Sequence, residues 1–255
     1  MRFGPLTAAR RACVVVLFAC AVVTSACAGR GAFKPEYEYE EELYLALDGS
    51  ATLNVNASVA SLVALRGFQL DPNPRARLDR AAVRTLFEGP GAIVSKVSLS
   101  RRDGRRFVHV SIDVGDVRRL GTLPPFAWSS YRFDRDGAIV EFRQTIGPSA
   151  GQQVSAGWAG QELVAFRMHL PSEIPFHNSP DGVQRGNILE WVQPLADRLT
   201  GAPLDLQVQL EPESILYTTL LLFGSTVVAA AVTFALLIWW VARRGRQGEM
   251  AESRS

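Results

Sequence analysis

The chain has 255 residues, of which 20% are charged and 47% hydrophobic, and its formal net charge is +2. Residues 28–213 carry 20 basic and 23 acidic side chains, which excludes a polycationic nucleic-acid binder. The three cysteines, Cys13, Cys20 and Cys27, all belong to the first 27 residues. The remaining chain is therefore no disulfide scaffold and must fold around a hydrophobic core.

The N-terminal segment has the pattern of a secretory signal peptide over residues 1–26. Arginines without an acidic residue precede an apolar run of 15 residues, which is too short to span a membrane. The run closes on Thr24-Ser25-Ala26-Cys27, which resembles a bacterial lipobox whose cysteine is acylated. Two outcomes stay open: acylation of Cys27, or ordinary cleavage after Ala28. Residues 27–35 are predicted to form a short tether.

Residues 36–213 predict an extracytoplasmic α+β domain that begins with a hairpin. An acidic run, residues 36–42, precedes a strand over residues 43–47. The turn Asp48-Gly49-Ser50 leads into a second strand over residues 51–58. We expect the acidic run to be a solvated sheet edge, with binding of a cation or a basic partner as the alternative.

Two helical segments follow the first hairpin. Ser58 is expected to cap a helix that ends near Gly67, and Asp79 to cap a second helix that stops at residues 89–91. The apolar spacing of both segments predicts helices that cover a sheet.

The rest of the domain predicts strands, mostly in antiparallel hairpins. The alternating segments are residues 93–100, 107–114, 129–134, 139–146, 161–170, 188–193 and 204–210. The sum is about nine strands and two or three helices, in one large curved sheet or in two sheets.

An uncharged stretch of 29 residues predicts a transmembrane helix over residues 214–242. A helix needs about 20 apolar residues to cross the hydrocarbon core. Arg243, Arg244 and Arg246 follow at once, as expected on the cytoplasmic side. We therefore expect a single-pass protein of the cytoplasmic membrane, with a basic cytoplasmic tail over residues 243–255.

The sequence contains no nucleophile elbow, P-loop, dinucleotide fingerprint or metal-ligand spacing. We expect no catalytic residues, cofactor or metal. His109 and His169 lie in alternating strands, where a hydrogen-bonded structural role is the ordinary one. A cysteine nucleophile is excluded, because processing leaves Cys27 at most.

A long polar loop after residue 170 is the first candidate ligand site. His177, Asn178 and Asp181 are the side chains in it that are suited to a polar ligand. The same three residues carry the alternative of an envelope hydrolase or transferase.

An arginine-rich turn between the strands at residues 93–100 and 107–114 is the second candidate site. Four arginines around one turn suit contact with anionic headgroups, although a polar hairpin tip is the ordinary alternative. These residues are Arg101, Arg102, Arg105 and Arg106.

Several short motifs resemble one bacterial family, the membrane-anchored lipoproteins of unknown function typified by mycobacterial LppM. Besides the lipobox and the C-terminal helix after Ser214, the matching residues are Asp48-Gly49-Ser50, Ile174, Asn178, Val183, Gly186-Asn187 and Trp191. The resemblance implies an α+β envelope domain that binds lipid or glycolipid, and it implies no catalytic residues.

The sequence thus favours a non-enzymatic envelope protein that binds a lipid-like ligand or a membrane protein partner. A structural or assembly subunit is a further alternative. Its interaction surface would be the spanning helix, which carries the small-residue pairs Ser225/Ala229 and Ala231/Ala235.

Overall fold

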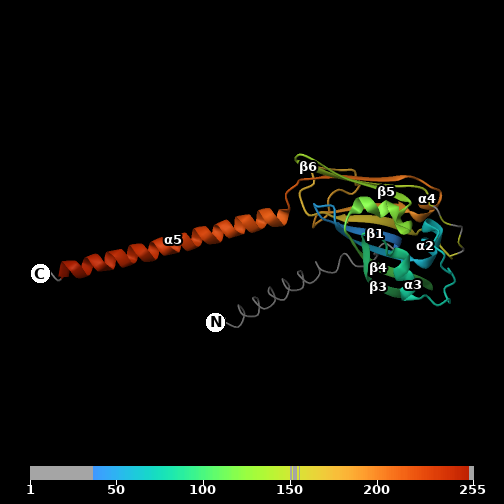
Figure 1. Ribbon diagram of the computed structural model, residues 1–255, viewed down its shortest axis with the longest axis horizontal. Coiled ribbons are helices and arrows are strands. Elements are labelled where there is room, and N and C mark those ends of the chain that lie inside the picture. The colour runs from blue at the N-terminus through green and yellow to red at the C-terminus, as the bar shows by residue number, and fades with distance from the viewer. Residues whose placement is uncertain (1–36, 150, 152–153, 155, 253–255) are drawn as a thin grey trace, which may run out of the picture. The chain divides into compact units, whose positions relative to one another are not determined.

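The computed structural model describes residues 37–149, 151, 154 and 156–252 (Figure 1). The predicted signal peptide (residues 1–26), Cys27 and the tether (residues 27–35) lie outside these residues. The described strands form two sheets, most strands pair in antiparallel fashion, and a long apolar helix ends the chain. The predicted α+β class is confirmed, and of the two arrangements left open the structure has two sheets.

The larger sheet, sheet A, joins the two ends of the domain. Its strands are β1 (Tyr37–Leu45), β2 (Ala51–Ser58), β3 (Ala92–Arg102), β4 (Arg105–Val114), β7 (Leu163–His169) and β9 (Ile188–Pro194). They lie in the order β3-β4-β2-β1-β7-β9. Strands β1 and β7 pair in parallel, and the other neighbours are antiparallel.

The smaller sheet, sheet B, is antiparallel throughout. Its strands are β5 (Ser129–Asp136), β6 (Ile139–Ile146), β8 (Phe176–His177) and β10 (Leu204–Leu210). The order is β5-β6-β10-β8. The short strand β8 comes from the loop that the sequence marks as a ligand site, so sheet B fixes part of that loop.

The described helices are α2 (Val59–Arg66), α3 (Arg80–Phe87), η1 (Val117–Thr122), η2 (Pro124–Phe126), α4 (Leu195–Leu199) and α5 (Ile215–Glu252). Of these, α2 and α3 begin at the capping residues that the sequence predicts. Ser58 accepts a hydrogen bond from the backbone N–H of Ser61 at 3.0 Å, and Asp79 accepts one from Ala81 at 3.1 Å. Helix α2 ends at Gly67, whose φ of 69° suits glycine.

The core lies between the sheets, where the alternation of each strand places its apolar side chains. Leu53 and Val55 of β2 face inward from sheet A, and Phe142 and Val208 face inward from sheet B; all four are buried. Helix α2 is buried along its whole length and packs on β1, β2 and β4. Buried apolar side chains of both sheets belong to one hydrophobic cluster.

The acidic run is a central strand, which corrects the expectation of a solvated sheet edge. Glu38 and Glu41 of β1 are both buried. Each carboxylate has a cationic partner, because Arg105 Nε lies 3.0 Å from Glu38 and Arg66 pairs with Glu41. Distant arginines therefore neutralise the run, and nothing in the local sequence predicts them.

The Glu41–Arg66 pair is the centre of a buried polar network. The Arg66 guanidinium also donates to the hydroxyl of Tyr39 and lies 3.4 Å from the centre of the Trp128 ring. Gln144 of β6 donates to the second carboxylate oxygen of Glu41 at 3.2 Å. Because this carboxylate contacts α2 and both sheets, the network fixes their relative positions.

Within the residues that the structure describes, one helix is long and apolar enough to cross a membrane. The segment Ile215–Trp240 of α5 has this character, and no part of it is buried against the domain. An exposed apolar helix of this length suits a lipid environment.

Removal of the Glu41 carboxylate should strongly destabilise the fold. Glu41→Ala leaves the Arg66 charge buried without its partner, and we expect the free energy of unfolding to fall by about 3–5 kcal/mol. Urea denaturation of the full chain in detergent micelles measures the change.

The exposed pair Arg132–Asp134 supplies the control, since Asp134→Ala should cost less than about 1 kcal/mol. The double variant Glu41→Leu/Arg66→Met should recover most of the lost stability. An equal loss in Glu41→Ala and Asp134→Ala would contradict a stabilising role for the pair.

Candidate functional site

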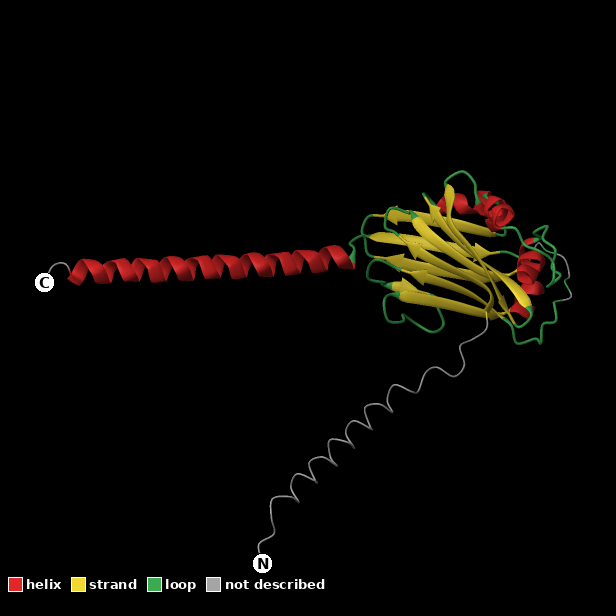
Figure 2. Cartoon of the chain, turned by 90° about the horizontal axis from the view of Figure 1, so that it is seen from below, coloured by secondary structure: helices red, strands yellow, loops and turns green. Residues whose placement is uncertain are grey.

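The outer face of sheet A carries polar side chains that are hydrogen-bonded to one another. The alternation that turns Leu53 and Val55 into the core turns Asn54 and Asn56 outward on the same strand. Helices α2 and α3 pack on strands of the sheet through their own buried side chains, Leu62 and Val83 among them. Figure 2 shows the strands as a broad face that no described helix crosses.

A continuous row of hydrogen bonds crosses this face and takes one side chain from every strand of sheet A. We name these residues the polar row: Ser100 of β3, His109 of β4, Asn56 of β2, Glu40 of β1, Arg167 of β7 and Glu190 of β9. Most of them are half-buried, so their polar atoms are positioned by neighbours and still reach solvent.

His109 connects the first half of the polar row. Its Nδ1 lies 2.9 Å from Asn56 Oδ1, and its Nε2 lies 2.7 Å from the hydroxyl of Ser100. The Asn56 amide group then donates to Glu40 at 3.1 Å. Because Asn56 offers its carbonyl oxygen, the imidazole donates from Nδ1 and accepts at Nε2. Burial, reinforced by the charge of Arg102, lowers the pKa of His109, which favours this neutral form.

Arg167 connects the second half of the polar row. It pairs with Glu40 on one side, and its Nε and Nη2 lie 2.8 and 2.7 Å from Glu190 on the other. Burial alone would lower the pKa of Arg167, but Glu40 and Glu190 outweigh it and raise that pKa. The hydroxyl of Tyr37 also donates to Glu190, at 3.1 Å. Three strands are thus joined by charge-assisted hydrogen bonds.

A shorter second set of contacts lies beside the polar row. His169 Nε2 is 2.7 Å from Glu42, and the Tyr44 ring stacks on the His169 ring at 4.0 Å with an interplanar angle of 13°. Ser111 donates to Asn54 at 2.7 Å. His109 and His169 lie in strands and each has a hydrogen-bond partner, as the sequence predicts.

This face is chemically suited to binding a flat, hydroxyl-rich molecule. It offers fixed amide, carboxylate and hydroxyl groups together with the half-exposed ring of Tyr44. Ser100 and His109 have the spacing of a nucleophile and a base, but the backbone of β4 between them and Asn56 is paired with β3 and β2 and offers no free N–H donors to an oxyanion. Within the described residues, no group of three or more His, Cys, Asp or Glu is placed to hold a metal.

The predicted loop residues play different parts in the structure. Asn178 is a structural residue: its side chain donates to the carbonyl of Asp205 at 2.8 Å and accepts from the N–H of Gln207 at 2.9 Å. His177 lies in β8, and Asp181 is exposed next to the turn at Gly182. A ligand role for His177, Asn178 and Asp181 stays a prediction.

The arginine-rich turn is largely occupied by contacts within the chain. Arg102 donates to the carbonyl of Tyr37 at 2.7 Å, Arg105 pairs with Glu38, and Arg106 donates to the carbonyl of Ala76 at 3.0 Å. These three contacts tie the turn to β1 and to the loop before α3.

Arg101 is the exposed member of the four. Contact of Arg101, Arg102, Arg105 and Arg106 with anionic headgroups stays a prediction.

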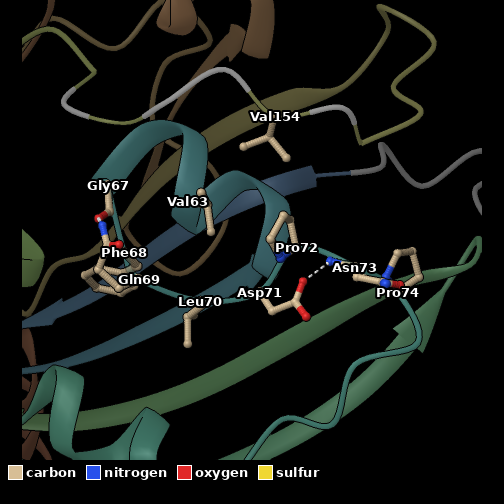
Figure 3. Close-up of a pocket in the computed structure, with 10 residues that line it drawn as sticks. All are labelled: Val63, Gly67, Phe68, Gln69, Leu70, Asp71, Pro72, Asn73, Pro74 and Val154. Carbon is tan, nitrogen blue, oxygen red and sulfur yellow. Dashed lines mark hydrogen bonds between the residues drawn. The ribbon is translucent and has the colours of Figure 1, made fainter.

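A surface hollow of about 470 Å³ lies beside α2 (Figure 3). Phe68, Leu70 and Val154 contribute its apolar lining, and Asp71 accepts a hydrogen bond from the backbone N–H of Asn73 at 2.8 Å. Because the rim at residues 71–74 is exposed, the hollow is open to solvent. It offers a shallow contact and no enclosed space for an acyl chain.

Of the polar row, His109 alone stands out in the sequence. Asn56, Glu40, Arg167 and Glu190 carry no motif, and the two ends of the Glu40–Arg167 contact are 127 residues apart. A local signal does exist, because polar side chains alternate with apolar ones over residues 52–56 and so share one face.

We expect His109 to make stability fall with decreasing pH. Its pKa is lowered in the folded state, so the unfolded chain takes up the proton first. The stabilisation is therefore complete above the ordinary histidine pKa of about 6.5 and is lost as the pH falls below it. His109→Gln should flatten this part of the stability profile, measured by urea denaturation between about pH 5 and 8. Identical slopes in both proteins would refute the assignment.

Comparisons with known proteins give one structural likeness. No protein-family model and no curated protein matches the chain. The structure is similar to the folded domain of LppM from Mycobacterium tuberculosis, solved by NMR, with 14% sequence identity and a TM-score of 0.39. The match covers 72% of this chain and 95% of the LppM domain. LppM is the protein that typifies the family whose short motifs this sequence resembles, and the function proposed below does not rest on the structural likeness.

Proposed function

We propose that the chain is a non-enzymatic cell-envelope protein whose domain binds the sugar headgroup of a glycolipid on the outer face of sheet A. Helix α5 crosses the cytoplasmic membrane, with the domain on the extracytoplasmic side and Arg243, Arg244 and Arg246 on the cytoplasmic side. The ligand then belongs to the same membrane as the protein.

The observation that carries this proposal is the polar row itself. Sheet faces open to water usually carry polar residues, but here six side chains from six strands hold one another in fixed positions. Such preorganisation lowers the entropy cost of binding, because the side chains are ordered before the ligand arrives.

The charges of the face favour a neutral sugar over a phosphate. At the β1–β7–β9 side of the face, Glu40 and Glu190 share the single guanidinium of Arg167, and the carboxylate of Glu42 pairs with His169. The cations Lys96 and Arg102 lie at the other side, near His109. An anionic headgroup would meet net repulsion at the β1–β7–β9 side, whereas sugar hydroxyls both donate to carboxylates and accept from amides. Tyr44, which stacks on His169 through one face of its ring and is half-exposed, adds an aromatic surface for contact with a sugar.

The proposal places the sugar, and not the acyl chain, of the glycolipid in the site, because the inner faces of both sheets pack together in one buried hydrophobic cluster. The hydrolase alternative draws no support from the described geometry, since Asn178 is used to hold the loop on β10. A membrane protein partner on the same face is the competing occupant.

Binding of a glycolipid should depend on Asn56. The full chain is placed in phosphatidylcholine nanodiscs with or without a neutral dihexosyl diacylglycerol, and native mass spectrometry counts the retained glycolipid. Asn56→Ala removes one donor and one acceptor of the polar row, and we expect affinity to fall about tenfold, the equivalent of about 1.4 kcal/mol.

Gln207→Ala supplies the matched control, because Gln207 donates to Glu141 at 2.9 Å on the outer face of sheet B. This variant should bind as the parent does. Equal retention in the parent and in Asn56→Ala would refute the glycolipid site, and a co-purifying protein lost only in Asn56→Ala would point to the partner instead.

A further inference from the structure

The start of α5 is hydrogen-bonded to the loop that follows β7. The backbone N–H of Ile215 donates to the carbonyl of Pro171 at 3.1 Å, and the hydroxyl of Ser214 reaches the same carbonyl at 3.3 Å. Four residues separate β10 from α5. The loop that begins at Pro171 therefore lies where the candidate membrane span begins.

The strand registers show which other segments share this end of the domain. Pro171 follows β7, and β7 runs parallel to β1 with His169 opposite Tyr44. The register continues along one line through Leu45, Ala51, Val114 and Ala92. The ends of β1, β4 and β7 and the starts of β2 and β3 thus lie together, and we name this the Pro171 end.

Exposed apolar side chains gather at the Pro171 end. Outside α5, the large hydrophobic side chains that are exposed among the described residues are Tyr44 (41% exposed), Ile93 (68%), Phe176 (43%) and Val183 (47%). Tyr44 and Ile93 lie on the line of paired residues or next to it.

Phe176 and Val183 belong to the same end through the loop. Phe176 pairs with Gln209, one residue before the end of β10. Val183 precedes Gln184, which bridges to Ile188 at the start of β9. Ile188 in turn lies opposite His169.

Single exposed hydrophobic residues are ordinary on a soluble surface and need no explanation. Their distribution distinguishes these four residues from such a background, because three separate segments from both sheets contribute them to one end of the domain. That end is also the one from which the apolar helix leaves the domain. Apolar clusters at such a position suit contact with lipid.

We propose that the Pro171 end rests on the bilayer that α5 crosses, with Tyr44, Ile93, Phe176 and Val183 in its interfacial region. Tyr44 has the amphipathic ring that this region favours. The strands of sheet A then run toward the membrane. At about 3.3 Å per residue, Glu40 of the polar row lies about 13 Å from Tyr44 along β1. The proposal goes beyond the glycolipid site and holds whether or not that site exists.

The arginine-rich turn lies at the opposite end of sheet A. Arg101 lies nine positions after Ala92 on β3, which corresponds to about 30 Å. A domain that stands on its Pro171 end keeps Arg101 away from headgroups. Lipid contact at the Pro171 end and lipid contact at Arg101 therefore indicate opposite orientations of the domain on the membrane.

Photocrosslinking of the full chain in phosphatidylcholine nanodiscs tests the orientation. The photoreactive amino acid benzoylphenylalanine replaces Phe176, Ile93 or Arg101 in separate proteins, and mass spectrometry counts lipid adducts at each position. All three side chains are exposed, and thermal unfolding checks that each variant folds as the parent does.

We expect lipid adducts at positions 176 and 93 to be severalfold more frequent than at position 101. Because positions 176 and 93 lie on different sheets, either one retains the test if the other variant fails to fold. Adducts that are rare at both positions, or that are as frequent at 101, would overturn the proposal. The second result would support headgroup contact by the arginine-rich turn.

Discussion

Strands β1 and β7 pair in parallel across a long stretch of intervening chain, with Glu40 and Arg167 127 residues apart in sequence. This pairing joins the N-terminal strands β1 to β4 to the hairpin of β7 and β9, and so creates a six-stranded sheet. It makes β1 central, places Glu40 beside Arg167 and completes the polar row. The same register places His169, two residues before Pro171, opposite Tyr44, so the outer face and the Pro171 end both depend on it.

The central position of β1 also explains why its inner face carries a buried charge. The Glu41 carboxylate contacts Arg66 from α2 and Gln144 from β6, and Tyr131 adds its hydroxyl 3.3 Å from the same glutamine. Burial keeps the Tyr131 phenol neutral by raising its pKa well above the usual range. An apolar core would pack as densely, but it would leave the position of sheet B on sheet A less specified. We regard this network as the device that fixes the register between the layers.

Local structure is predictable from this sequence because its determinants are local. The caps at Ser58 and Asp79 and the strand over residues 204–210 are found where the patterns place them. The acidic run misleads, since the free-energy cost of burying Glu38 and Glu41 is offset by Arg105 and Arg66, which no spacing rule connects to it. The polar row escapes prediction for the same reason: its members become neighbours through strand pairing alone.

Along β1 the side chains of the outer face change from charged to apolar over a short distance. Glu40 lies in the charged row, Glu42 shares a hydrogen bond with His169, and Tyr44 stacks its ring on that histidine while remaining half-exposed. Beyond Tyr44 come the exposed apolar side chains of the Pro171 end. A bilayer surface changes in the same order, from water through polar headgroups to the apolar core. A domain that stands on this end would meet each layer of the membrane with side chains of matching polarity, and the polar row would lie at the depth that a sugar headgroup reaches.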